Sequence, residues 1–222
     1  MTTIAFDVYG TLINTYGMVD LLQRYIGEDK AFPFATLWRD KQLEYSFRRS
    51  MMNRYEPFYT CTINALDFCL ETFQVSITRD QHFSLIKRYQ SLPAFKDVVA
   101  ALSSLSERSD IQIYALTNGP RQEVEKLFED ENIHQYFKDI VSADEIKKFK
   151  PDPAVYQHFL DRTGADIEDC WLVSGNAFDV IGASSFGMKS IWLKRAALQQ
   201  MDTWGARPLH TITSLSQLEA LF

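Results

Sequence analysis

Five short apolar runs, separated by segments with helical spacing, constrain the fold of this chain more than any other feature. The runs are hydrophobic throughout, as strands are when both faces of a parallel sheet are covered. They span residues 3–6, 111–116, 139–143, 170–174 and 189–194, and a weaker run at 210–213 fits an edge strand. Strands that alternate with helices form βαβ units. The sequence therefore predicts an α/β fold.

Three segments between the later runs have the pattern of crossover helices. Residues 97–107 and 121–130 place apolar side chains at spacings of three and four. The segment 153–163 begins with a proline and stops before Gly164, which is typical of helix ends. These helices complete the prediction of a doubly wound, Rossmann-like parallel sheet.

The segment between the first two runs departs from this alternation. Residues 15–93 contain no convincing strand, but Val19, Leu22 and Ile26 begin a series of helical spacings. The segment is too long to be a loop. We interpret it as an inserted α-helical cap over the carboxyl ends of the strands, where doubly wound sheets place their sites. The core domain then comprises residues 1–14 and 94–222; a separate, non-catalytic helical domain is the less favoured alternative.

The composition excludes several classes of protein. The apolar fraction of 46% suits a folded core, and a net charge of −6 argues against nucleic-acid binding. No stretch approaches the ~18 apolar residues of a membrane helix, and the N-terminus lacks the pattern of a signal peptide. Three cysteines without CxxC spacing are expected to be reduced, buried thiols. We therefore expect a cytoplasmic protein with no membrane partner.

Polar residues follow four of the predicted strands at the point where each strand ends. Asp7 follows the first, Thr117 and Asn118 the second, Lys150 the third, and Ser174 to Asp179 the fourth. Singly, such residues are ordinary turn and capping residues. Together, at the carboxyl ends of parallel strands, they predict a catalytic site.

These residues, in this order, resemble the four motifs of the haloacid dehalogenase superfamily, and the match covers nearly the whole chain. Within the superfamily, the segments FDVYGTL, LWRDKQLEYS, LTNG, KPDPAVY and VSGNAFDVIGASSFG resemble the (S)-2-haloacid dehalogenases. The segment LWRDKQLEYS, residues 37–46, discriminates most, because it lies in the predicted cap, where superfamily members share least.

The resemblance implies a reaction and a role for each site residue. Short (S)-2-haloacids would be hydrolysed to (R)-2-hydroxy acids and halide, without a metal or other cofactor, by a homodimer. Asp7 would be the nucleophile and Arg39 the cation at the halogen, in a catalytic set of Asp7, Thr11, Arg39, Lys150, Ser174, Asn176 and Asp179. The residues expected to bind substrate are Val8, Tyr9, Arg39, Leu43, Phe58, Thr117, Asn118, Tyr156 and Phe178.

Tyr9 discriminates between this reaction and the phosphoryl transfer that dominates the superfamily. A phosphatase needs an acid two residues after the nucleophile, and a phenol with a pKa near ~10 is a poor substitute at neutral pH. Chloride leaves as a stable anion and needs no proton. A magnesium-dependent phosphatase nevertheless stays an alternative, as does a binding module that has kept the fold; the retained polar set argues against the latter.

Overall fold

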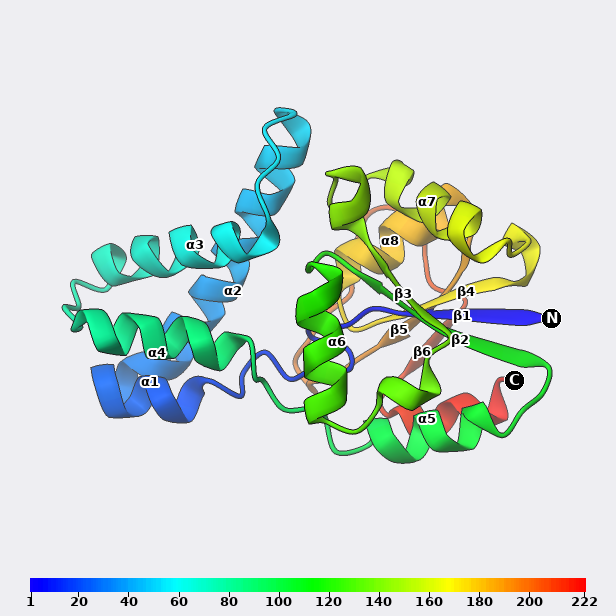
Figure 1. Cartoon of the computed structure of the whole chain (residues 1–222), viewed down its shortest axis with the longest axis horizontal. Coiled ribbons are helices and arrows are strands. Elements are labelled where there is room, and N and C mark those ends of the chain that lie inside the picture. The colour runs from blue at the N-terminus through cyan, green and yellow to red at the C-terminus, as the bar shows by residue number, and fades with distance from the viewer. The chain divides into compact units, whose positions relative to one another are not determined.

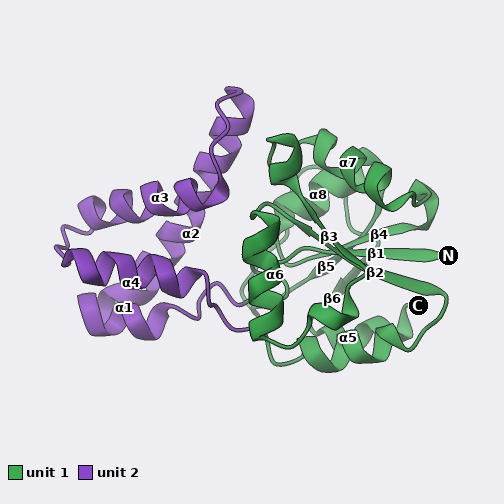
Figure 2. Ribbon diagram, in the orientation of Figure 1, with its two compact units in different colours: residues 1–13, 94–222 green, residues 14–93 purple.

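The computed structural model describes residues 1–222, which form two compact units (Figure 2). One consists of residues 1–13 and 94–222, and the other of residues 14–93. The strands of the first unit are β1 (Thr2–Phe6), β2 (Ile111–Thr117), β3 (Asp139–Ser142), β4 (Cys170–Ser174), β5 (Lys189–Leu193) and β6 (His210–Ile212). Its α-helices are α5 (Val98–Ser106), α6 (Arg121–Asp130), α7 (Pro153–Thr163) and α8 (Ala177–Phe186).

The six strands form one sheet in the order β3-β2-β1-β4-β5-β6, and every neighbouring pair is parallel. Helices α5 and α6 cover one face, and α7 and α8 cover the other (Figure 1). Because both faces are covered, Ile4, Ala5 and Phe6 of the central strand are fully buried. This explains the continuous apolar runs and confirms the predicted doubly wound α/β fold.

The direction in which the chain adds strands reverses between β1 and β4. From β1 the chain adds β2 and β3 on one side, and then crosses back to add β4 and β5 on the other. Ligands of doubly wound sheets bind at such a switch point, beyond the carboxyl ends of the strands. Asp7 and Ser174 lie there, and the Asp7 N–H donates to the Val173 carbonyl at 3.0 Å.

Local sequence signals account for several element ends. Helix α7 begins where the Asp152 side chain accepts the Ala154 N–H at 3.0 Å, and it ends at Gly164, whose φ is 65°. Strand β3 ends one residue earlier than predicted. There the Ser142 hydroxyl accepts the Asp144 N–H at 3.1 Å and starts a 3₁₀ turn at residues 143–146.

The unit of residues 14–93 contains four helices and no strand: α1 (Val19–Ile26), α2 (Glu28–Met51), α3 (Phe58–Thr72) and α4 (Arg79–Tyr89). Helix α2 packs on α1 and α3. One link between α2 and α3 is the buried Trp38, whose Nε1–H donates to the Thr62 carbonyl at 2.8 Å. Helix α4 begins at a capping box in which Thr78 and Gln81 exchange hydrogen bonds.

Two further expectations concern the whole chain. None of its helices has the length and apolar character needed to cross a membrane. All three cysteines, Cys61, Cys69 and Cys170, are unpaired and buried, as predicted.

Candidate active site

A tight turn after β1 places the side chain of Thr11 beside that of Asp7. The N–H groups of Thr11, Leu12 and Ile13 all donate to the Val8 carbonyl, at 3.2, 2.9 and 3.0 Å. The turn brings the Thr11 hydroxyl to 2.5 Å from Asp7 Oδ2. Asp7, the residue that follows β1, therefore accepts one hydrogen bond from within its own loop.

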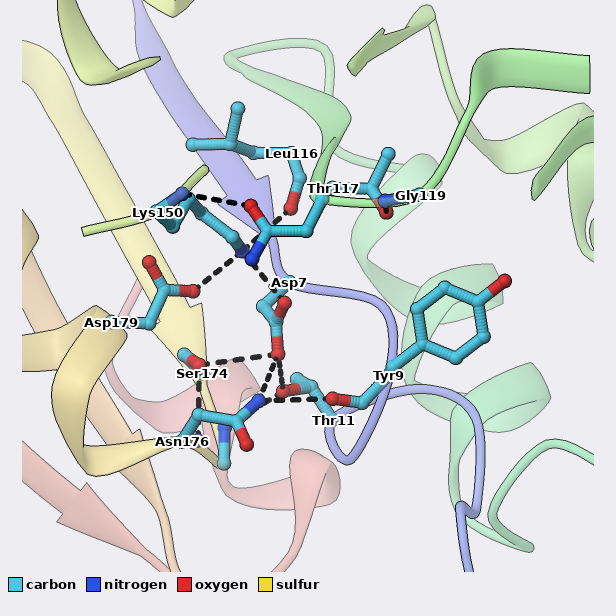
Figure 3. A network of polar contacts seen from close by, with 12 residues as sticks. Asp7, Tyr9, Thr11, Leu116, Thr117, Gly119, Lys150, Ser174, Asn176 and Asp179 are labelled. Atoms are coloured by element: carbon cyan, nitrogen blue, oxygen red, sulfur yellow. Dashed lines mark hydrogen bonds and ion pairs between the residues drawn. The ribbon is translucent and has the colours of Figure 1, made fainter. Parts of the chain in front are cut away.

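Asp7 is only 5% exposed, and both of its carboxylate oxygens have donors (Figure 3). Oδ1 accepts from the Lys150 ammonium at 2.7 Å. Oδ2 accepts from Thr11, from Asn176 Nδ2 at 2.7 Å and from the Ser174 hydroxyl at 3.3 Å. A buried carboxylate without such donors would be unstable, and these donors also fix its orientation. The structure thus brings together five of the predicted catalytic side chains.

Lys150 lies between two carboxylates and is 1% exposed. Its Nζ donates to Asp7 Oδ1 and Asp179 Oδ2, both at 2.7 Å, and to the Leu116 carbonyl at 2.9 Å. Burial alone lowers the pKa of Lys150, but the charges of Asp179 and Asp7 outweigh burial and raise it. The side chain therefore stays an ammonium ion in the sheet-end cluster of Asp7, Lys150 and Asp179.

Asp179 is fully buried and accepts hydrogen bonds on both oxygens. Oδ2 faces Lys150, and Oδ1 accepts from the Tyr156 hydroxyl at 2.8 Å. Burial raises the pKa of Asp179; Lys150 opposes this rise, and the Asp7 charge adds to it. Burial and the Asp179 charge also hold the pKa of Tyr156 well above its ordinary value, so its hydroxyl stays a donor.

Asn176 stands at the N-cap position of α8, yet its side chain does not cap the helix. Its Nδ2 donates instead to Asp7 Oδ2 and, at 2.9 Å, to the Tyr9 carbonyl. The preceding Gly175 donates its N–H to Thr11 Oγ1 at 2.8 Å. A Cβ atom at Gly175 would lie 2.3 Å from the Gly10 carbonyl oxygen, so the two loops can approach this closely only with glycine there.

The oxygens of this site that would attract a divalent cation already have N–H donors. Asn176 Nδ2 bridges Asp7 Oδ2 and the Tyr9 carbonyl, and Lys150 Nζ bridges Asp7 and Asp179. No group of three or more His, Cys, Asp or Glu side chains is arranged to hold a metal ion. Because Mg²⁺ needs converging anionic oxygens, these residues do not fit a magnesium site.

Comparison with known proteins assigns the family. Residues 1–187 match the haloacid dehalogenase-like hydrolase family. The chain belongs to this family. It is 31% identical to (S)-2-haloacid dehalogenase 2 of Pseudomonas sp. (strain CBS-3), over 98% of this chain and 94% of that protein.

Two solved structures extend the likeness to the fold. One is the crystal structure of a dehalogenase, 30% identical, with a TM-score of 0.94 over 100% of this chain and 97% of that one. The other is the L-2-haloacid dehalogenase from Xanthobacter autotrophicus with chloropropionic acid covalently bound. It is 25% identical, with a TM-score of 0.91 over 100% of this chain and 98% of that one. The haloacid dehalogenase-like fold is thus matched along the whole chain.

In this member of the haloacid dehalogenase-like family, Tyr9 and Thr117 lie near each other at the ends of β1 and β2. The Tyr9 side chain points away from the Asp7 carboxylate (Figure 3). Its ring is close enough to Gly119 that a Cβ there would lie 3.0 Å from Tyr9 Cε2. Thr117 Oγ1 accepts the Gly119 N–H at 3.0 Å. The position two residues after Asp7 therefore places no acid beside the nucleophile.

The other predicted substrate-binding residues of the first unit differ in exposure. Val8 is fully buried and Phe178 is half-buried, on the first turn of α8. Asn118 Oδ1 accepts the Lys150 backbone N–H at 2.8 Å, so the amide NH₂ of Asn118 is the group left to donate. This orientation suits a ligand that accepts hydrogen bonds.

Three predicted site residues, Arg39, Leu43 and Phe58, belong to the helical unit. Arg39 and Leu43 are half-buried on α2, and Phe58 is buried at the start of α3. Arg39 donates to Gln42 Oε1 at 2.7 Å, and this buried oxygen also accepts from the Tyr89 hydroxyl at 2.6 Å. The place of these three residues in the family's active site stays a prediction.

Two side chains that bond to the loops of the site were missing from the predicted set. Arg195 donates to the Thr11 carbonyl, and Gln199 donates to the Gly175 carbonyl. The sequence signal was that Arg195 directly follows the fifth apolar run, and Gln199 comes four residues later, in a place where the other strands also deliver polar residues. It was weak because both residues contact backbone oxygens, which have no signature in the sequence.

Proposed function

We propose that this protein hydrolyses short-chain (S)-2-haloacids to (R)-2-hydroxy acids and halide, through an ester on Asp7 and without a metal. The observation that carries the proposal is the environment of Asp7. Its carboxylate is held by donors on both oxygens, while Tyr9 turns away, so the position two residues after Asp7 offers no acid to a leaving group. Displacement of a halide needs no such acid, whereas release of an alcohol from a phosphate ester does.

In the first step, an oxygen of Asp7 attacks C2 of the haloacid. The new C–O bond forms as the carbon–halogen bond breaks, the halide leaves with the electron pair, and the configuration at C2 inverts. The hydroxyl of Thr117 and the N–H groups of Val8 and Tyr9 hold the substrate carboxylate. Lys150 offsets the repulsion between this carboxylate and Asp7, which its 2.7 Å contact supports.

The halide leaves toward cationic and amide donors. In this proposal residues 15–93 form a cap over the carboxyl ends of the strands, and the cap supplies the Arg39 guanidinium. Asn118 adds an N–H donor, in keeping with the amide orientation imposed by the Lys150 N–H. Side chains that wall the pocket around the alkyl group and the halogen are Tyr9, Leu43, Phe58 and Phe178.

In the second step, water hydrolyses the ester. Asn176 positions the water and Asp179 takes its proton, with Ser174 and Lys150 completing the network and Tyr156 holding Asp179. The water oxygen adds to Cγ of Asp7, and the bond from Cγ to the ester oxygen, which came from Asp7, breaks. The proton taken by Asp179 passes to that oxygen, and the hydroxy acid leaves with it. The raised pKa of Asp179, caused by its burial, supports this role because a stronger base accepts a proton more readily.

The proposal also covers assembly and location. A homodimer follows from the resemblance to (S)-2-haloacid dehalogenases, and light scattering of the purified protein tests it. A cytoplasmic location is supported by three unpaired, buried cysteines, since thiols persist in reducing compartments.

The decisive experiment measures halide release from (S)-2-chloropropionate and (S)-2-bromopropionate in the presence of a metal chelator. A generic aryl phosphate with magnesium is assayed in parallel. Halide release that survives chelation, and is lost in Asp7→Asn, is the expected result. Phosphate release that depends on magnesium, without halide release, would instead identify a phosphatase.

A further inference from the structure

We propose that Arg195 and Gln199 are positioning residues that fix Thr11 and the loop at Gly175 in place beside the Asp7 carboxylate. Neither side chain contacts Asp7 itself. Together with Asp97, which anchors Arg195, they form what we call the Arg195 clamp. The inference builds on the proposed function, because its kinetic effect is measured on that reaction.

The first half of the clamp acts on the backbone of Thr11. Arg195 donates to the Thr11 carbonyl through both Nε, at 3.0 Å, and Nη2, at 2.5 Å. The same residue places its hydroxyl 2.5 Å from Asp7 Oδ2. Since two donors converge on one carbonyl, the peptide plane of Thr11 is fixed, and this limits where its hydroxyl can point.

Arg195 is itself held by an ion pair with Asp97. Its Nη1 lies 2.8 and 2.9 Å from the two carboxylate oxygens of Asp97, and its side chain is 11% exposed. Asp97 also accepts the Leu215 N–H at 2.9 Å and the Ser214 hydroxyl at 3.1 Å. Burial raises the pKa of Asp97, but the Leu215 N–H and Arg195 outweigh burial and lower it. The anchor is therefore charged at neutral pH.

The second half of the clamp acts on the loop after β4. Gln199 Nε2 donates to the Gly175 carbonyl at 2.6 Å, and Gln199 Oε1 accepts the Arg195 backbone N–H at 3.0 Å. The Gly175 N–H donates to Thr11 Oγ1 at 2.8 Å. The hydroxyl of Thr11 is thus a donor to Asp7 and an acceptor from Gly175, and one short segment, 195–199, braces both loops that meet there.

This arrangement makes a specific kinetic prediction. A loosened Thr11 hydroxyl would let the Asp7 carboxylate turn away from the line of attack, and misplacement by about 1 Å can cost up to ~10²-fold in rate. Because the clamp bonds to the backbone of Thr11 and Gly175 and to none of the proposed substrate-binding residues, substrate binding should change little. Arg195→Met should therefore lower kcat for halide release by about 10–100-fold while KM stays within about threefold.

Arg121→Met is the matched control. Arg121 also contacts carboxylates, Glu125 at 2.7 Å and Asp139 at 2.6 Å, and donates to the Ile140 carbonyl at 3.0 Å, but it does not contact the loops around Asp7. It should lower thermal stability and leave kcat unchanged. An equal fall of kcat in Arg121→Met and Arg195→Met would overturn the proposal, because the loss would then reflect general stability.

A double-mutant cycle with Thr11→Val separates positioning from structural damage. If Arg195 acts through Thr11, then Arg195→Met should lower kcat far less in the Thr11→Val background than in the wild type. Fully multiplicative effects would contradict the proposed route. Gln199→Leu is a milder second variant that keeps the test valid should Arg195→Met not fold, with kcat expected to fall about tenfold.

Amide hydrogen exchange tests the clamp without any activity measurement. In Gln199→Leu, the Gly175 N–H should exchange at least about tenfold faster, while the central β1 amides are unchanged. Unchanged exchange at Gly175 would overturn the clamp. If the wild-type protein releases no halide, the proposed function fails, and this measurement still decides the clamp independently.

Discussion

Replacing Lys150 by methionine removes the single ammonium that bridges Asp7 and Asp179 while keeping most of the buried volume. The lysine Nζ lies 2.7 Å from an oxygen of each carboxylate, so those two oxygens are no more than twice that distance apart. Both carboxylates stay buried in the variant. Asp7 keeps Thr11, Ser174 and Asn176 as donors, whereas Asp179 keeps only Tyr156.

The expected loss follows from charge repulsion. Two unit charges at ~5 Å repel by about 3 kcal/mol at an effective dielectric constant of ~20. The variant can escape by protonating one carboxylate, which at pH 7 costs about 4 kcal/mol for a group with an ordinary pKa near ~3.9. We therefore expect the free energy of unfolding at pH 7 to fall by about 3–4 kcal/mol, within the usual cost of breaking a buried ion pair.

The pH dependence of this loss has a definite sign. In the wild type the pKa of Lys150 is raised in the folded state, so its contribution is present at neutral pH and is lost only as pH rises above ~10.5 through the folded pKa. In the variant Asp179 loses its cation, so its folded pKa rises further and stability falls as pH increases from about 4 to 7. At pH 5 protonation costs only about 1.5 kcal/mol, so the deficit should shrink to about that value.

Urea unfolding at pH 5 and pH 7 measures both deficits. Lys126→Met is the control, because Lys126 makes an exposed ion pair with Asp130 and should change stability by less than about 0.5 kcal/mol. A Lys150→Met deficit of the same size at both pH values would refute the electrostatic account and attribute the loss to packing. Halide release by Lys150→Met should be abolished at either pH.

The remaining predictions concern the two proposed steps. Tyr156→Phe removes the 2.8 Å hydrogen bond to Asp179 and so should raise the pKa of Asp179 further. The acid limb of the kcat–pH profile should therefore move to higher pH. If the limb does not move, Asp179 is not the base of the second step. A single turnover in heavy-oxygen water should label the peptide that contains Asp7, and label found only in the hydroxy acid would indicate direct attack by water. Arg39→Ala should lose most halide release while circular dichroism stays unchanged, and near-normal turnover would exclude Arg39 from the reaction.

The strands were predictable because their environment acts on every residue in them. Burial on both faces of the sheet forces continuous apolar runs, and this pattern located β1 to β5. Strand β6 lies at the edge with His210 and Thr211 exposed, so its run is weaker. The early end of β3 was not predictable, since it depends on the Ser142 hydroxyl turning back to the Asp144 N–H. A local hydrogen bond of this kind competes with strand pairing. It leaves no trace in the pattern of apolar residues, so the pattern cannot locate the end of the strand.

The hydrogen-bond partners of Asn176 and Lys150 could not be predicted from residue types alone. Asn176 occupies a position where asparagine commonly caps a helix, and only the approach of β1 to β4 makes Asp7 and the Tyr9 carbonyl its partners. Lys150, next to a proline, has the sequence context of a solvated residue, yet it is buried. In both cases the partner comes from a distant segment, so the sheet order decides the role.

The charges of the site argue for a substrate with one negative charge. Asp7, Asp179 and Lys150 together carry one net negative charge in the folded core. In the proposed reaction the Arg39 guanidinium adds one positive charge, which balances the net charge of these three side chains. A haloacid adds one negative charge, which Arg39 and the N–H donors can offset, whereas a phosphate monoester adds nearly two and usually binds with a divalent cation. Because Asn176 and Lys150 already bridge the oxygens that would hold such a cation, the same contacts that orient Asp7 favour the monoanion.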